Sequence, residues 1–255
     1  MTERLRIDLN ADLGEITGNA GRAIDQAMMS VVTSANVACG FHAGDGETMR
    51  SACALAVAHG VVVGAHVSYD DREGFGRRDV DVTVPKLVED VVAQLIALAD
   101  IACAAGTTVR YVKAHGALYN RSAHDLDHAS ALVQAVAAHD SNLVLLAAPR
   151  SIASELAVVA GLRVAYEGFV DRSYRHDGTL TPRSEPRAVH GTSQECVAQA
   201  MSIVVTRSLA ASSGERVVLS VDSLCVHGDT PHAVVTAQQV RAALVAQGVA
   251  LRPFV

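Results

Sequence analysis

Short runs of apolar and β-branched residues alternate along this chain with longer, alanine-rich stretches of helical periodicity. Most of the short runs are apolar at consecutive positions, which is typical of strands in a parallel sheet that helices cover on both faces. Strands are predicted at residues 5–9, 31–38, 61–65, 108–113, 143–147, 163–167 and 217–221. The alternation continues to the end of the chain, so the pattern predicts an α/β fold.

Three of the helices between these runs have recognisable ends. Leucine, valine and alanine recur at helical spacing before Gly106, a residue type that commonly follows the last turn of a helix. Thr192 and Glu195 have the spacing of a capping box, which predicts the start of another helix. Thr230 followed by Pro231 predicts the start of the final helix.

The series of strands and helices is not interrupted. No change in composition and no linker rich in proline, glycine or serine divides the sequence, so we expect one domain over residues 1–255. A series of about seven βα units fits a closed or nearly closed barrel better than an open sheet, because the sequence has neither a dinucleotide-binding glycine motif nor a two-domain break. The predicted architecture is therefore a seven-stranded (β/α) barrel.

The composition favours chemistry on small molecules. The 255 residues include 21 lysines and arginines against 27 aspartates and glutamates, and the net charge of −6 disfavours nucleic acids and anionic membranes as partners. The chain starts with a charged segment rather than a signal peptide, and none of its apolar runs has the length of a membrane span. Because the five cysteines show no CxxC spacing, we expect a protein of the reducing cytoplasm.

Polar residues collect near the C-terminal ends of the predicted strands. In a parallel barrel these ends converge on one rim, where loops carry catalytic groups. Some of the residues, such as Asp45, are expected to serve only as helix caps. The collected residues include Asn10, Asp12, Glu15, His42, Asp45, His66, Lys113, His115, Glu167, Asp171, Arg172, Asp222, His227 and Asp229.

Several segments resemble one protein family. They include IDLNADLGE at residues 7–15, ANVACGFHAGD at 35–45, VKAHGALYN at 112–120 and VHGDTP at 226–231. These segments closely resemble the LamB/YcsF family, and the match runs in order through most of the chain. The resemblance implies a distorted barrel of the glycoside hydrolase/deacetylase type. It also implies the A subunit of the prokaryotic ATP-dependent 5-oxoprolinase, which works with two partner subunits to open 5-oxo-L-proline to L-glutamate.

Asp12, His42 and His66 follow three successive strands, so a carboxylate and two imidazoles are expected to meet. Two interpretations remain open, a divalent metal site with open positions or acid–base groups that act without metal. Lys113 ends an apolar strand beside His115, and it is either a point charge for an anion or an amine whose pKa burial lowers. The carboxylate of the implied substrate and the phosphate released from ATP favour the anion role.

We expect catalytic roles for Asp12, His42, His66, Lys113 and His115. Residues expected to bind substrate are Asn10, Glu15, Arg77, Arg78, Glu167, Asp222 and His227. The sequence contains no G-x-x-x-x-G-K-[ST] phosphate-binding loop. ATP, which the resemblance implies as co-substrate, is therefore expected to bind at a site that the partner subunits complete.

Three functions follow from these observations. The first is the ATP-dependent, lactam-opening subunit. The second is a metal-dependent deacetylase or carbohydrate hydrolase of the same fold, which requires a tightly bound divalent ion. The third is a non-catalytic scaffold that positions partner subunits.

Overall fold

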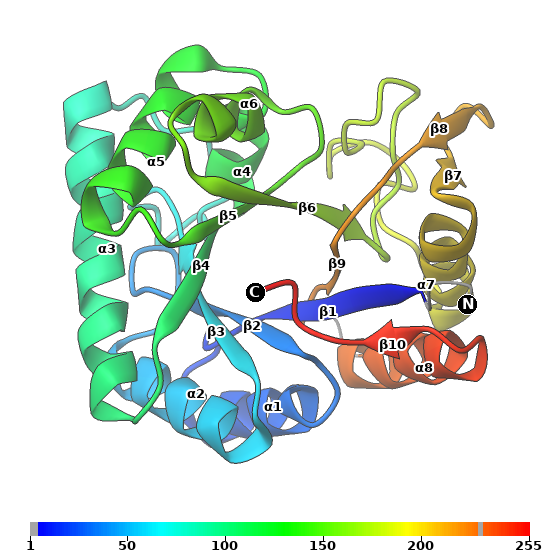
Figure 1. Cartoon of the computed structure of the whole chain (residues 1–255), viewed down its shortest axis with the longest axis horizontal. Coiled ribbons are helices and arrows are strands. Elements are labelled where there is room, and N and C mark those ends of the chain that lie inside the picture. The colour runs from blue at the N-terminus through cyan, green and yellow to red at the C-terminus, as the bar shows by residue number, and fades with distance from the viewer. Residues whose placement is uncertain (1–4, 229–231) are drawn as a thin grey trace.

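Parallel strands form a closed barrel with helices on the outside (Figure 1). The computed structural model describes residues 5–228 and 232–255. The barrel closes because its last strand pairs with both the sixth strand and the first. In spatial order the seven barrel strands are β1 (Arg6–Leu13), β2 (Ser34–Ala38), β3 (Val62–Val67), β4 (Val109–Ala114), β5 (Val144–Ala147), β6 (Arg163–Phe169) and β9 (Ser223–Val226).

The helices surround this barrel and bury its outer face. They are α1 (Gly18–Met29), α2 (Gly46–His59), α3 (Val84–Ala104), α4 (Gly116–Ser122), α5 (Leu126–His139), α6 (Ile152–Val159), α7 (Ser193–Met201) and α8 (Ala233–Ala246). A short π-helix, η1 (Ser202–Thr206), extends α7. Within the described ranges, no helix combines the length and apolarity needed to cross a bilayer.

Two of the predicted helix ends are confirmed. Gly106 adopts a left-handed conformation (φ 83°) just beyond α3, and Thr192 and Glu195 form the capping box of α7. Asp45 caps α2 by accepting a hydrogen bond from the backbone N–H of Thr48. The start of α8 that was predicted at Thr230 and Pro231 lies outside the described residues, as does Asp229.

The predicted last barrel strand at residues 217–221 is wrong. That segment begins in β8 (Arg216–Val218), which forms a separate antiparallel pair with β7 (Ser208–Ala210). The side chain of Val218 is largely exposed, whereas every residue of β9 is buried. The sequence of β9, SLCV, is short and only partly apolar, and it therefore gave a weaker strand signal than the valines before it.

A tenth strand, β10 (Ala250–Leu251), pairs with the beginning of β1 and was not predicted. The chain then crosses the N-terminal opening of the barrel, and the C-terminus lies over the barrel in the view of Figure 1. There Phe254 packs edge-on against Tyr111, with ring centroids 5.0 Å apart. The C-terminal segment thus covers the barrel end opposite the candidate site.

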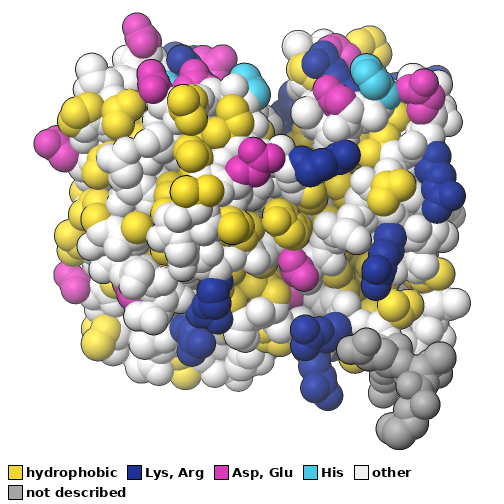
Figure 2. Space-filling view, turned by 45° about the horizontal axis from the view of Figure 1, so that its top comes forward, with side chains coloured by type: hydrophobic (Ala, Val, Ile, Leu, Met, Phe, Trp, Pro, Cys, Tyr) yellow, Lys and Arg dark blue, Asp and Glu magenta, His cyan; other side chains and the backbone are white. Residues whose placement is uncertain are grey.

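Much of the barrel interior is polar. Asp8, Asn10 and Asp12 alternate along β1 with apolar residues that face the helices, and their partners lie on other strands of the barrel. The expectation that Asn10 and Asp12 follow the strand is therefore wrong, because β1 continues to Leu13 with both residues pointing inward. On the face shown in Figure 2, charged side chains of both signs lie among apolar ones, and several of them gather along its upper edge.

Candidate active site

Lys113 lies at the centre of a buried group of polar side chains inside the barrel. Its Nζ atom is 3.0 Å from Asp12 Oδ1 and 2.9 Å from Glu167 Oε1. The same atom is 3.1 Å from Cys225 Sγ and 3.5 Å from Asn10 Oδ1. We call these five residues the lysine cluster. They come from β1, β4, β6 and β9, so the closed barrel is what brings them together.

The amino group of Lys113 lies between the carboxyl groups of Asp12 and Glu167. Burial alone lowers the pKa of Lys113, but the Asp12 and Glu167 carboxylates raise it well above its usual value. Burial alone raises the pKa of Asp12, but the charges of His66 and Lys113 outweigh it and lower this pKa well below its usual range. The pKa of Glu167 is raised, chiefly by burial. Of the two roles predicted for Lys113, this geometry favours the point charge over the neutral amine.

A chain of amide groups fixes the lysine cluster. Asn10 Nδ2 donates to Glu167 Oε1 at 3.0 Å, and Asn36 Nδ2 donates to both Asn10 Oδ1 and Asp12 Oδ1 at 2.7 and 2.8 Å. The Tyr111 hydroxyl donates to Asn36 Oδ1 at 2.6 Å. Asn36 was not predicted as a site residue, although it lies on β2 within one of the family segments. The amide chain orients both carboxyl groups toward Lys113.

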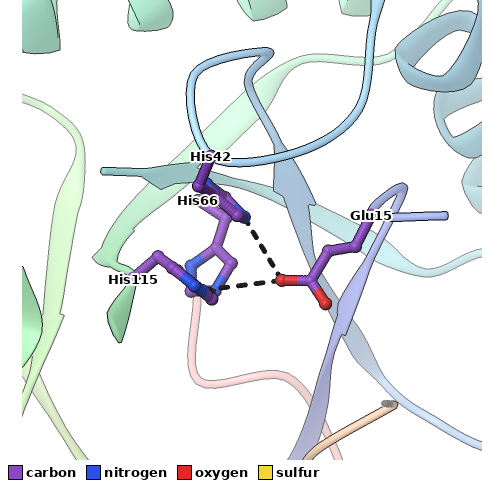
Figure 3. Close-up of side chains that lie close together, drawn as sticks. All are labelled: Glu15, His42, His66 and His115. Atoms are coloured by element: carbon purple, nitrogen blue, oxygen red, sulfur yellow. Dashed lines mark hydrogen bonds and ion pairs between the residues drawn. The ribbon is translucent and has the colours of Figure 1, made fainter. Parts of the chain in front are cut away.

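Three histidines and a glutamate form a second group beside the first (Figure 3). We call Glu15, His42, His66 and His115 the imidazole cluster. His42 Nε2 is 3.2 Å from Glu15 Oε1, and His115 Nδ1 is 3.5 Å from the same oxygen and 2.9 Å from His66 Nε2. His66 Nε2 also lies 3.3 Å from Asp12 Oδ1, which connects the two clusters.

The second nitrogen of each imidazole has a partner outside the cluster. His42 Nδ1 is 2.9 Å from Ser68 Oγ, His66 Nδ1 is 3.2 Å from the Lys113 carbonyl oxygen, and His115 Nε2 is 2.9 Å from the Phe75 carbonyl oxygen. Phe75 has a left-handed backbone (φ 54°), a costly conformation for a bulky residue. That strain is consistent with a functional need to aim its carbonyl at His115.

Burial disfavours the charged form of two of the three imidazoles. Burial lowers the pKa of His42 to about 4. Burial, followed by the neighbouring His66 and His42, lowers the pKa of His115 well below its usual value. The rings of His42 and His115 are stacked, with centroids 3.8 Å apart and planes 6° from parallel. Neutral imidazoles present one N–H and one lone pair each.

A carboxylate–histidine pair also borders the lysine cluster. His227 Nδ1 is 2.9 and 2.8 Å from the two carboxylate oxygens of Asp171, and the ring stacks on Phe169. A nitrogen of His227 lies within 4.8 Å of Asp12 and Cys225 ligand atoms. Burial alone lowers the pKa of His227, but Asp171 raises it above its usual value. A cavity of about 260 Å³ opens beside this pair.

Two residues expected to bind substrate lie away from the clusters. Asp222 precedes β9 and caps the N-terminal end of the barrel, where its backbone and side chain bond β1 and β6, so its expected place on the C-terminal rim is wrong. Arg78 forms ion pairs with Asp71 and Glu73, and its side chain is 60% exposed. Arg77 lies nearer, with its guanidinium carbon 4.9 Å from the centre of the Phe75 ring.

The structure groups the expected metal ligands Asp12, His42 and His66 differently from the prediction. His42 and His66 do meet, but the groups within 4.8 Å of one another around them are Glu15 and His115 rather than Asp12. Asp12 is instead bonded to Lys113 and Asn36. Gly14 has φ 70° in the turn after β1, and the next residue, Glu15, contacts His42 and His115.

Two buried polar atoms beside Lys113 remain unpaired. Within residues 5–228 and 232–255, neither Glu167 Oε2 nor the Tyr119 hydroxyl has a hydrogen-bond partner. The Tyr119 ring contacts Phe169, and Lys113 Nζ lies 5.2 Å from the centre of the same Phe169 ring. Buried polar atoms without a protein partner are uncommon, so both atoms remain available to water or to a bound molecule. Tyr119 was not predicted, although it stands in the VKAHGALYN segment.

Comparison with known proteins identifies close relatives. The model of the LamB/YcsF family matches residues 7–255. A protein of Agrobacterium fabrum that is named as a 5-oxoprolinase A subunit is 46% identical over 248 residues, which are 97% of each chain. A protein of Streptomyces avermitilis with the same designation is 49% identical over 248 residues, which are 97% of this chain and 99% of that one.

Solved structures confirm the fold. The lactam utilization protein from Thermus thermophilus superposes with a TM-score of 0.91 at 38% identity, covering 98% of this chain and 100% of that one. The catalytic domain of a peptidoglycan N-acetylglucosamine deacetylase from Eubacterium rectale superposes with a TM-score of 0.53 at 12% identity, over 100% and 90% of the two chains. This second likeness shows that the predicted barrel of the deacetylase type is correct. With a family match over nearly all of its length, the chain belongs to the LamB/YcsF family.

Proposed function

We propose that this chain is the A subunit of an ATP-dependent 5-oxoprolinase and that its lysine cluster binds the lactam. The names of full-length relatives at 46% and 49% identity support this activity. The observation that carries the binding site is the pair of unpaired buried atoms beside Lys113, one acceptor at Glu167 Oε2 and one donor at the Tyr119 hydroxyl. A lactam presents the complementary pair, an N–H donor and a carbonyl acceptor.

In this proposal, the lactam bonds both atoms. Glu167 Oε2 accepts the hydrogen bond from the ring N–H, and Tyr119 donates to the carbonyl oxygen. Lys113 then supplies positive charge where negative charge develops on that oxygen and on a transferred phosphoryl group. Arg77, at the edge of the imidazole cluster, is the candidate anchor for the ring carboxylate.

The reaction needs ATP because an amide carbonyl is a poor electrophile. The lactam oxygen attacks the γ-phosphorus, the bond to ADP breaks, and a cyclic imidate phosphate forms. Water adds to the imidate carbon while Asp12 accepts one of its two protons. The C–N bond then breaks as the ring nitrogen takes a proton from His227, and the remaining hydroxyl proton passes to the released amine as the acyl carbonyl forms. The resulting γ-glutamyl phosphate is hydrolysed by a second water to glutamate and inorganic phosphate.

The nucleotide site belongs to a larger assembly of subunits. Because the sequence has no phosphate-binding loop, we assign completion of the nucleotide site to two partner subunits. Such an enzyme acts on a cytoplasmic metabolite, and the five cysteines, all of them free, fit that compartment. The imidazole cluster supports one alternative, a metal-dependent deacetylase or carbohydrate hydrolase that acts without ATP.

Replacement of Tyr119 by phenylalanine tests the lactam site. An unpaired buried hydroxyl contributes nothing to folding, so Tyr119→Phe is expected to keep or increase stability. In the complex with both partners, the lost substrate hydrogen bond is expected to lower kcat/KM for 5-oxoproline about tenfold, the equivalent of ~1.4 kcal/mol.

The matched control is His139→Ala at the end of α5, which should leave both quantities unchanged. An unaltered kcat/KM in Tyr119→Phe would remove the lactam from this position. Loss of activity only when the complex itself fails to assemble would favour the scaffold function instead.

A further inference from the structure

We infer that the imidazole cluster of Glu15, His42, His66 and His115 is a binding site for one divalent transition-metal ion such as Zn²⁺. The site differs from the ligand set that the strand order suggested, because it excludes Asp12 and adds Glu15 and His115. It requires neither ATP nor a lactam, so it stands independently of the proposed reaction.

The outer hydrogen bonds fix which nitrogens carry hydrogen. The carbonyl oxygens of Lys113 and Phe75 only accept, so His66 Nδ1 and His115 Nε2 must be donors. Ser68 Oγ donates its own hydrogen to the Tyr69 carbonyl oxygen at 2.9 Å, and it therefore accepts from His42 Nδ1. Whenever one of these rings is uncharged, its nitrogen that faces the cluster therefore carries the lone pair.

These lone pairs and the Glu15 carboxylate face one another at short range. His42 Nε2 and Glu15 Oε1 are two acceptors 3.2 Å apart, and His115 Nδ1 lies 2.9 Å from His66 Nε2. A single proton on His66 relieves its contact with His115 but leaves His42 facing the carboxylate. A cation among the four groups satisfies all of them at once.

The distances suit a tetrahedral ion. With metal–ligand bonds of about 2.0–2.1 Å, the donor atoms of a tetrahedral site lie ~3.3 Å apart. The three separations measured here are 2.9, 3.2 and 3.5 Å. Three imidazoles and one carboxylate are typical ligands of zinc and of neighbouring transition metals.

The supporting residues resemble those around metal sites. Metal-bound histidines usually donate their other N–H to a carbonyl, carboxylate or hydroxyl oxygen, and all three histidines do so. Gly76 packs against the pair, since a Cβ there would lie 2.8 Å from both His115 Cδ2 and His42 Cβ. The rings of His42 and His115 are stacked in parallel. One ring must therefore turn about its Cβ–Cγ bond before the lone pairs of both rings point at the same ion. An ion held by these four residues would supply Lewis acidity beside Asp12.

Metal content measured without substrate tests the site. The full chain is stripped with a chelator, checked for folding by circular dichroism, and titrated with Zn²⁺ or Co²⁺ in the presence of a competing chromophoric chelator. We expect one ion per chain, a higher Tm with the ion, and the visible absorption of tetrahedral Co²⁺.

Variants locate the ion. His42→Gln and His115→Gln are expected to lose the binding, and Ser68→Ala, which removes only an outer partner, to weaken it about 10–100-fold. The control His139→Gln should bind like the parent chain. The inference is overturned if the folded parent chain binds no ion, or if affinity and the Co²⁺ spectrum survive substitution of His42 and His115. Neither result affects the lactam assay, so the two proposals fail separately.

Discussion

Replacement of Lys113 by methionine measures how strongly the barrel interior depends on one charge. Methionine keeps an unbranched side chain of similar length, while Asp12 and Glu167 lose an ammonium group 3.0 and 2.9 Å away. Removing one partner of a buried ion pair costs about 3–5 kcal/mol, because the other charge stays buried without compensation. We expect Lys113→Met to lose that much free energy of unfolding near neutral pH.

The loss should depend on pH in a defined direction. Without the ammonium group, the pKa of Glu167, already raised by burial, rises further. The folded state then binds protons more readily than the unfolded state. The penalty is therefore complete at pH values above that pKa, decreases as the pH falls below it, and vanishes near the pKa of glutamate in the unfolded chain. The difference between Lys113→Met and the parent chain should therefore shrink between about pH 7 and about pH 5.

Urea unfolding followed by circular dichroism at both pH values measures this difference. The matched control is Lys86→Met, which removes the only other lysine, an exposed residue paired with Asp90 on α3, and should change stability little. A loss below about 1 kcal/mol for Lys113→Met, or an equal loss at the two pH values, would refute the reasoning about a buried charged cluster.

Three further perturbations follow from the structure. Gly76→Ala should abolish metal binding and cost roughly 1–3 kcal/mol in urea unfolding, because Gly76 has φ 63° and its Cβ would meet His115; parent-like stability would contradict this. Asp171→Asn lowers the pKa of His227, so the alkaline limb of the kcat profile should move to lower pH; an unmoved limb would exclude His227 as the acid. Burial raises the pKa of Asp25 to about 6, so its ionised form destabilises the fold. Asp25→Asn should therefore gain stability relative to the parent chain as the pH rises from about 4 to about 7. A stability difference that does not change with pH would contradict the assignment.

The strand pattern predicted most of the barrel because parallel strands buried on both faces are apolar at most positions. Six of the seven predicted strands coincide with barrel strands. The pattern failed at β9, where Ser223 and Cys225 face a polar interior and break the apolar run. It also ended β1 too early, since Asn10 and Asp12 look like loop residues until the barrel closes around them.

Part of the candidate site could be predicted from the positions of the strand ends. Residues at strand ends converge, so Asp12, Lys113 and Glu167 were expected near one another, and they are in contact. The sequence could not separate the lysine cluster from the imidazole cluster, because that division depends on the turn at Gly14 and on the left-handed backbone at Phe75. Loop conformations of this kind follow from tertiary packing and leave little trace in local pattern.

The dependence of glutamate release on ATP tests the central claim most directly. The chain is assayed with 5-oxoproline alone, with ATP, and with ATP together with its two partner subunits, and glutamate and ADP are measured in the same samples. We predict that glutamate appears only in the complete mixture and in equal amount to 5-oxoproline-dependent ADP. Steady release of glutamate by the isolated chain without ATP would contradict the proposed function and would favour a metal-dependent hydrolase.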